Sequence, residues 1–167
     1  MQLSTLYRLP SLNDLYWVPG GSPDLKPEYG YSLEAGSKLS WKSQNKKTKV
    51  SFEPTYFNRY IYNWIIWMPH SNYWQPQNIM EVWSRGWETF SLIEHSIKQL
   101  NFLCDINTSY VVSTSEKKKS NNDLSIGKQL IYVPVYSAKV GMGLRYKTIT
   151  IRLNSTYTGY RLSLIHI

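Results

Sequence analysis

The residue types that could do chemistry are few in this chain and do not gather. Cys104 is the single cysteine, which excludes an internal disulfide and a thiolate metal site of the usual spacing. The three histidines, His70, His95 and His166, are scattered, with no acidic partner at metal-ligand spacing. No nucleophile is accompanied by a base and an orienting group. We therefore expect no catalytic site, no metal site, no cofactor and no enzyme activity.

Large amphipathic side chains are the other candidates for a functional site. Aromatics make up 15% of the chain, with fourteen Tyr and seven Trp against four Phe. Tyr and Trp combine an apolar ring with a polar group, which suits an interface or contact with a bulky ligand. We expect six of them to lie in long connections and to contact substrate: Tyr16, Trp17, Tyr62, Trp64, Trp67 and Trp74.

The elements that carry these residues are long strands. From Glu28 to Trp41 the odd positions are apolar, aromatic or small, and the even positions carry the polarity. Period two over this length indicates one strand with a dry and a wet face. Globular strands average about 5–6 residues, whereas membrane strands need roughly 9–11, with apolar side chains outward and aromatics at both interfaces. The segment therefore suits a bilayer better than a soluble core.

The same alternation recurs along the chain, around residues 50–56, 100–110, 138–146 and 149–157, and more weakly in Ile79–Ile97. Short turns are expected near Ser43–Lys47, His95–Gln99 and Tyr146–Lys147, and long connections at Asn58–Gln77 and Ser113–Gly127. Short turns on one side and long loops on the other are typical of outer-membrane barrels. The sequence predicts an all-β fold, about six strands of an antiparallel up-and-down transmembrane barrel.

Charge should divide the two faces of these strands, because Lys or Arg facing hydrocarbon at mid-membrane costs about 2–4 kcal/mol. The side chains expected to face lipid are Tyr29, Leu33, Leu39, Val140, Leu144, Ile149 and Ile151. Those expected to face the lumen are Glu34, Lys38, Lys139, Arg145 and Arg152.

The formal charge of +8 raises nucleic acid as a partner. Much of the excess sits in Lys46, Lys47 and Lys49 and in Lys117–Lys119, within expected turns and loops. Charge runs of this kind are usually solvated loop tips, and no nucleic-acid-binding signature accompanies them. We expect no nucleic-acid partner.

Two motifs near the start carry a family resemblance. Leu9–Trp17 is Leu-Pro-Ser-Leu-Asn-Asp-Leu-Tyr-Trp, and Gly20–Glu28 is Gly-Gly-Ser-Pro-Asp-Leu-Lys-Pro-Glu. Together with Arg8 they resemble the Arg-x-Pro-Thr-Leu-Asn-Asp-Leu-Tyr and Gly-Asn-Pro-x-Leu-Lys-Pro-Glu segments of TonB-dependent outer-membrane receptors. Ser11 stands where Thr is common, and Ser22 where Asn is. Later matches are Tyr56, Phe57, Ile61, Asn63, Ile65, Trp67, Pro76, Asn78, Val82, Gly86 and Glu88.

The resemblance covers about residues 1–161. Within the family, the sequence pattern is similar to that of cobalamin and siderophore receptors of Bacteroidetes-type bacteria. It implies a barrel of about 22 strands with a plug in its lumen, located in the cell outer membrane. It also implies import of a scarce nutrient, an iron chelate or cobalamin, driven by the TonB complex through an N-terminal plug region outside this chain. The partners implied are outer-membrane lipid, TonB and a small nutrient ligand.

The ends of the chain suggest a piece of a longer barrel domain. Met1 opens into a strand-like stub without the regions of a signal peptide. We expect residues 1–161 to be part of a receptor barrel truncated at both ends. Codons for Leu162–Ile167 resemble a transposon-end adapter used in preparing sequencing libraries, so we expect residues 162–167 to be a non-native tail. An ordinary apolar tail is the alternative.

An alternative function is a soluble, aromatic-rich β domain that binds glycan through Trp64, Trp67 and Trp74. Interfacial anchoring or packing within a loop is the other role open to these tryptophans. A soluble sheet should carry charges on its exposed face, whereas the dry faces of four of these strands carry none. The outer face of the sheet therefore separates the two hypotheses.

Overall fold

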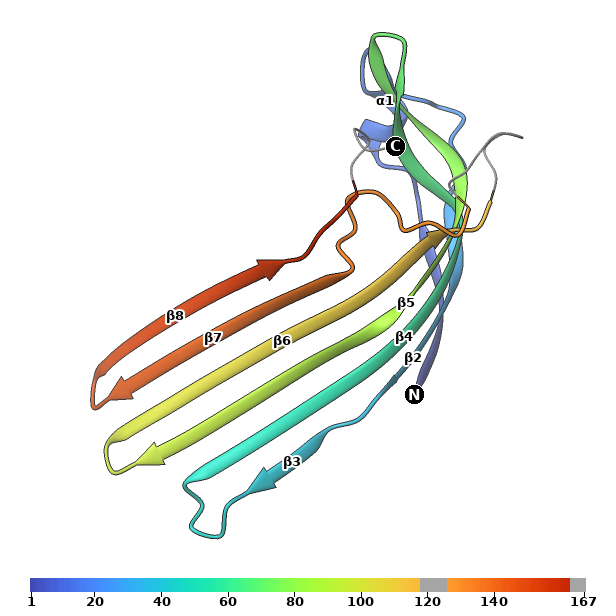
Figure 1. Ribbon diagram of the computed structural model, residues 1–167. Helices are drawn as coiled ribbons and strands as arrows, with labels where there is room; N and C mark the ends of the chain where they lie inside the picture. The colour runs from blue at the N-terminus through green and yellow to red at the C-terminus, as the bar shows by residue number, and fades with distance from the viewer. Residues whose placement is uncertain (118–125, 163–167) are drawn as a thin grey trace. The chain divides into compact units, whose positions relative to one another are not determined.

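The computed structural model describes residues 1–117 and 126–162, where the chain is almost entirely β (Figure 1). Part of the expected Ser113–Gly127 connection, with Lys118 and Lys119, and residues 163–167 of the tail lie outside the described residues. The predicted all-β antiparallel fold is confirmed. Across the described ranges no helix is long and apolar enough to cross a membrane. The elements are β1 Gln2–Arg8, α1 Leu12–Tyr16, β2 Glu28–Gly36, β3 Leu39–Lys42, β4 Thr48–His70, β5 Tyr73–Ile97, β6 Leu100–Ser115, β7 Tyr136–Tyr146 and β8 Ile149–Thr158.

The strands follow one another across a single sheet in the order β1-β2-β4-β5-β6-β7-β8, with β3 also paired to β4. Neighbouring strands are consecutive in the sequence, as in an up-and-down barrel wall. The chain divides into two compact units. Unit 1 comprises Met1–Glu34, Asn58–Arg85 and Val112–Leu130, and unit 2 comprises Ala35–Phe57, Gly86–Val111 and Ile131–Ile167.

The described residues form eight strands instead of about six for two reasons. First, the opening stub is a paired strand, β1, with Tyr7 opposite Tyr29 of β2. Second, the strand expected over Glu28–Trp41 is interrupted between β2 and β3. There the N–H of Ser37 donates to the carbonyl of Pro54 at 3.1 Å. Proline has no N–H to donate in return, so one ladder bond is missing where the interruption occurs.

The prediction of a long connection at Asn58–Gln77 is wrong. Strands β4 and β5, of 23 and 25 residues, run through this segment and leave only Ser71 and Asn72 between them. The run from Tyr60 to Trp67 is rich in aromatic and β-branched residues, which favour strands. The weakly patterned segment Ile79–Ile97 lies within β5, as predicted.

Three short turns of unit 2 lie where they were expected. Residues 43–47 join β3 to β4, Lys98 and Gln99 join β5 to β6, and Lys147 and Thr148 join β7 to β8. Figure 1 shows all three at the same end of the strands. Each contains a lysine in the left-handed region, with φ of 57° at Lys46, 53° at Lys98 and 50° at Lys147.

Candidate functional site

One face of unit 2 is free of charge along its strands. The pairing of β6, β7 and β8 puts Phe102 beside Leu144, and Leu144 beside Ile151. On β3 and β4, Leu39 lies opposite Phe52 in the same way. Many of these side chains are exposed, with 68% of Ile151 and of Leu153 accessible. The main members of this charge-free face are Leu39, Trp41, Val50, Phe52, Tyr56, Trp87, Leu100, Phe102, Ile106, Tyr110, Tyr136, Val140, Met142, Leu144, Tyr146, Ile149, Ile151, Leu153 and Tyr157.

Aromatic side chains bound the charge-free face at both ends of its strands. At one end Tyr56 contacts Trp87 with ring centroids 5.1 Å apart, and Tyr136 contacts Tyr157 at 6.1 Å. At the short-turn end stand Trp41 and Tyr146. Strand β7 runs from one row to the other in 11 residues, which at about 3.4 Å per residue and a tilt of about 40° spans roughly 25 Å. This is the height of the apolar band of an outer-membrane barrel.

The opposite face of unit 2, the charged face, holds ion pairs that join different strands. Lys38 pairs with Glu53 at 2.6 Å, and Lys49 with Glu94 at 3.3 Å. The predicted separation of charged and apolar side chains onto opposite faces of the sheet is therefore confirmed for neighbours such as Lys38 and Leu39. The register likewise puts Lys139, Arg145 and Arg152 on the face opposite Val140, Leu144, Ile149 and Ile151.

A third ion pair on the charged face reaches over a glycine. Arg152 of β8 contacts Asp105 of β6 at 2.6 Å, although β7 lies between these strands. Gly141 of β7 makes this possible, since a Cβ there would lie 2.6 Å from a carboxylate oxygen of Asp105. The glycine therefore leaves room for a link between non-neighbouring strands.

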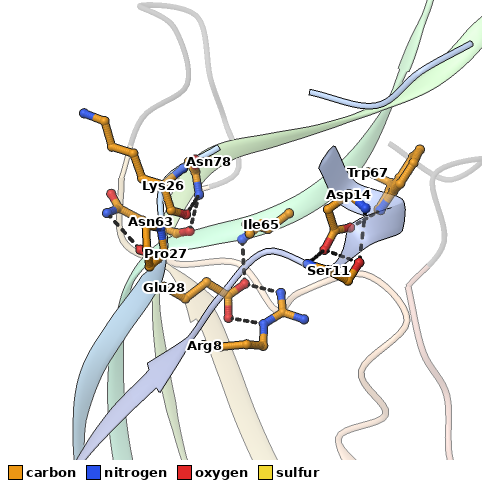
Figure 2. Close-up of polar contacts among 10 residues, drawn as sticks. All are labelled: Arg8, Ser11, Asp14, Lys26, Pro27, Glu28, Asn63, Ile65, Trp67 and Asn78. Carbon is orange, nitrogen blue, oxygen red and sulfur yellow. Dashed lines mark hydrogen bonds and ion pairs between the residues drawn. The ribbon is translucent and has the colours of Figure 1, made fainter. Parts of the chain in front are cut away.

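In unit 1 the family-like motif residues form three groups of polar contacts (Figure 2). Glu28, only 5% exposed, accepts two hydrogen bonds from the Arg8 guanidinium, one of them from Nε at 2.7 Å. The same carboxylate accepts the backbone N–H of Ile65 at 2.8 Å. One buried carboxylate thus ties β1, β2 and β4 together.

Helix α1 is held on β4 by a second carboxylate, Asp14. Ser11 and Asp14 form a capping box that satisfies backbone N–H groups at the helix start. The indole Nε1 of Trp67 also donates to Asp14, at 2.9 Å. Burial raises the pKa of the Asp14 carboxyl, but hydrogen bonds from Ser11 and Trp67 and the charge of Arg8 outweigh it, so the pKa lies below its ordinary value of 3.8. Asp14 is therefore charged at neutral pH.

The turn that leads into β2 is fixed by two asparagines of the β4–β5 hairpin. Asn78 accepts the backbone N–H of Lys26 at 2.7 Å and donates to the Lys26 carbonyl at 2.9 Å. Asn63 donates to the carbonyl of Pro27 at 3.3 Å. Farther from β2, Gly20 approaches β5 so closely that a Cβ would lie 1.9 Å from the Trp74 carbonyl oxygen. Only glycine fits at that contact.

The structure places the six aromatic candidates in unit 1 but not all in loops. Tyr16 ends α1 and Trp17 follows it, whereas Tyr62, Trp64 and Trp67 lie on β4, and Trp74 lies on β5. The loop assignment of these four is wrong, because β4 and β5 extend through the segment.

The six candidates also differ in how much surface they offer. Tyr62 stacks on Tyr29 with ring centroids 4.9 Å apart, and Trp67 is bound to Asp14. Tyr16, Trp17 and Trp74 keep 64%, 56% and 48% of their surface exposed. Gly20 lies close to the backbone of Trp74, so the segment after Trp17 passes next to β5.

Sequence reasoning recognised the motif residues but assigned them no role. Five polar residues fix the position of the segment between β1 and β2: Arg8, Asp14, Glu28, Asn63 and Asn78. The available signal was the presence of charged side chains within an aromatic and apolar region. Their partners could not be paired with them, since Ile65 is 37 residues from Glu28 and Trp67 is 53 from Asp14.

Comparison with known proteins agrees with this geometry. A family model described as TonB dependent receptor-like, beta-barrel, matches residues 1–163. The chain belongs to the TonB-dependent receptor β-barrel family. Members of this family lie in the outer membrane, which is therefore the location of this TonB-dependent receptor chain.

Two similar proteins are both named Vitamin B12 transporter BtuB. The one from Vibrio vulnificus strain YJ016 is 30% identical over 95 residues, which are 56% of this chain and 14% of that protein. The one from strain CMCP6 is 26% identical over 158 residues, which are 95% of this chain and 22% of that protein. This TonB-dependent receptor chain therefore spans 14% and 22% of the length of these relatives.

Proposed function

We propose that this chain forms part of the barrel wall of a receptor that imports a scarce nutrient, cobalamin or an iron chelate, with TonB-coupled energy. The observation that carries the proposal is the charge-free face of unit 2, roughly 25 Å tall and bounded by aromatics. The relatives named as vitamin B12 transporters favour cobalamin. Residues 1–161 then supply one part of a barrel of about 22 strands, with the plug and the TonB contact outside this chain.

The ligand-contact region in this proposal is the β4–β5 hairpin with the segment before β2. Strands of 23 and 25 residues are over twice the roughly 9–11 that a membrane crossing needs, so their excess length extends into water. The β4–β5 turn is itself short, so the excess strand length decides the side. The end where strands extend beyond the membrane is extracellular in such barrels, and the end where short turns follow the aromatic row is periplasmic. Charged side chains in unit 1 support an aqueous location for this part of the strands. Lys117 pairs with Glu81 at 3.3 Å, and Arg85 lies 3.7 Å from the Trp83 ring centroid.

The soluble glycan-binding domain is set aside on the same grounds. In a soluble protein the apolar face of an antiparallel sheet is covered by another layer of the fold, whereas the charge-free face of unit 2 exposes Leu144, Ile149 and Ile151 at 46%, 65% and 68%. For the exposed aromatics of this outer-membrane receptor chain we consider two roles, ligand contact and interfacial anchoring.

Single substitutions of Trp17, Trp64 and Trp74 by Ala in the complete receptor separate these two roles. We expect Trp17→Ala and Trp74→Ala to weaken nutrient affinity about tenfold or more, because exposed aromatic anchors dominate binding energy. Trp64, which is half-buried, should have a smaller effect. Affinity is measured by titration calorimetry with cobalamin and with a ferric chelate, and assembly by heat-modifiable electrophoretic mobility.

Trp41→Ala is the matched control, because Trp41 is equally exposed but belongs to the short-turn end of unit 2. It should leave nutrient affinity unchanged. Unchanged affinity in all three test variants, with assembly impaired, would refute ligand contact and leave interfacial anchoring as the role of these tryptophans.

A further inference from the structure

A groove opens in unit 2 between the β5–β6 turn and the β7–β8 turn. It is lined by Ile97, Lys98, Gln99, Leu100, Tyr146 and Lys147. Leu100 and Tyr146 are register partners on β6 and β7, so the two turns are held side by side by the strand ladder. The groove is therefore a feature of the sheet and not of a single loop.

The lining of the groove is amphipathic. Leu100 and Tyr146, which are 40% and 50% exposed, belong to the charge-free face. Ile97, which is 51% exposed, extends this face. The two turn lysines supply positive charge, and the Lys147 ammonium lies 5.5 Å from the centroid of the Tyr146 ring. Among the residues that the structure describes, no acidic side chain lines the groove.

The backbone of both turns supports a role for the lysines. Lys98 and Lys147 each occupy the first position of a two-residue turn with positive φ. Gly and Asn are favoured in such positions, whereas a long side chain is not. A cation therefore stands at each turn where a smaller residue would fit the backbone better.

The position of the groove restricts what can occupy it. Its apolar side is continuous with the face that lies against hydrocarbon, and its cations stand just past the aromatic row at the short-turn end, the level of lipid headgroups. A water-soluble anion would use the lysines but not the apolar side. A molecule that uses both has an anionic head and an acyl chain.

We propose that this groove binds the headgroup of an anionic phospholipid, such as phosphatidylglycerol, in the periplasmic leaflet. Lys98 and Lys147 contact the phosphate, and the acyl chains lie along Leu100 and Tyr146. The site depends on the outer-membrane location of the chain and not on which nutrient the receptor imports. Loss of lipid binding and loss of nutrient binding are separate measurements.

The test uses the complete receptor, delipidated in uncharged detergent and titrated with phosphatidylglycerol or phosphatidylcholine of the same acyl chains, with native mass spectrometry as the readout. The test variant is Lys98→Asn with Lys147→Asn, because Asn removes the charge and suits positive φ. The control, Lys128→Asn with Lys139→Asn, removes the same charge outside the groove. Heat-modifiable mobility verifies that each receptor is folded.

We expect each groove lysine to contribute about fivefold and the double variant to lose about 25-fold in phosphatidylglycerol affinity. The variant should retain one fewer phosphatidylglycerol per receptor, while the control stays within about twofold of the wild type. Lys98→Arg with Lys147→Arg should bind phosphatidylglycerol like the wild type, since it keeps both charges. Equal affinity in the wild type and the Asn variant, an equal loss in the control, or equally tight phosphatidylcholine binding would overturn the proposal.

Discussion

Replacing Glu28 with Ala is expected to lower the free energy of unfolding by about 2–3 kcal/mol and to release the segment before β2. The substitution removes the acceptor of the Ile65 N–H, which stays buried in β4, and both hydrogen bonds to Arg8. An unsatisfied buried N–H alone costs about 1–3 kcal/mol. The Arg8 side chain is 55% exposed, so its guanidinium can be hydrated when the ion pair with Glu28 is lost. Losing this ion pair therefore lowers the free energy of unfolding by less than losing a fully buried pair would.

Denaturant unfolding of the complete receptor in micelles measures the energy, and protease cleavage within residues 9–27 measures the release. Glu28→Gln should show a smaller loss, because its amide oxygen can still accept the Ile65 N–H. Glu88→Ala, at an exposed position of β5, serves as the control and should change neither readout. If Glu28→Ala behaved like Glu88→Ala, the positioning role of Glu28 would be wrong.

The second large effect is expected on the charge-free face. Leu153 lies near the middle of the band on β8, opposite Met142. Leu153→Arg should cost about 2–4 kcal/mol, the cost of a cation facing hydrocarbon at the midplane. Asn154→Arg places the same side chain one residue on, on the charged face, and should cost less than about 1 kcal/mol.

Both variants are measured in the complete receptor by the fraction that shows heat-modifiable mobility in outer membranes and by denaturant unfolding. The difference between the two neighbours is the decisive quantity, because length and charge of the new side chain are identical. Equal losses, or a larger loss for Asn154→Arg, would show that the charge-free face does not meet lipid.

Strand faces could be predicted from the sequence because they depend on local alternation. Around β7 each residue's parity fixes its face, so Val140 and Leu144 separate from Lys139 and Arg145 without knowledge of the partner strand. The interruption after Gly36 depends on a residue in another strand, Pro54, and sequence patterns do not reveal that pairing.

The hairpin of β4 and β5 was missed for a different reason. Clear alternation of apolar and polar residues marks β4 only around residues 50–56, so the sequence places the strand end there, whereas the strands themselves continue through the aromatic-rich segment that follows. The aromatic candidates were therefore assigned to a loop. Which of them keep free surface depends on distant contacts, such as Asp14 with Trp67 and Tyr29 with Tyr62, and could not be read from the sequence.

Lipid contact by the charge-free face is tested most directly with spin labels placed singly at positions 139, 140, 144 and 145 of β7 in the complete receptor, with Cys104 replaced by Ala. Collision rates with oxygen, which concentrates in lipid, and with a water-soluble nickel complex are measured at each position. We expect high oxygen and low nickel accessibility at Val140 and Leu144, and the reverse at Lys139 and Arg145. Higher nickel than oxygen accessibility at Val140 and Leu144, or no alternation along β7, would contradict a lipid-facing wall.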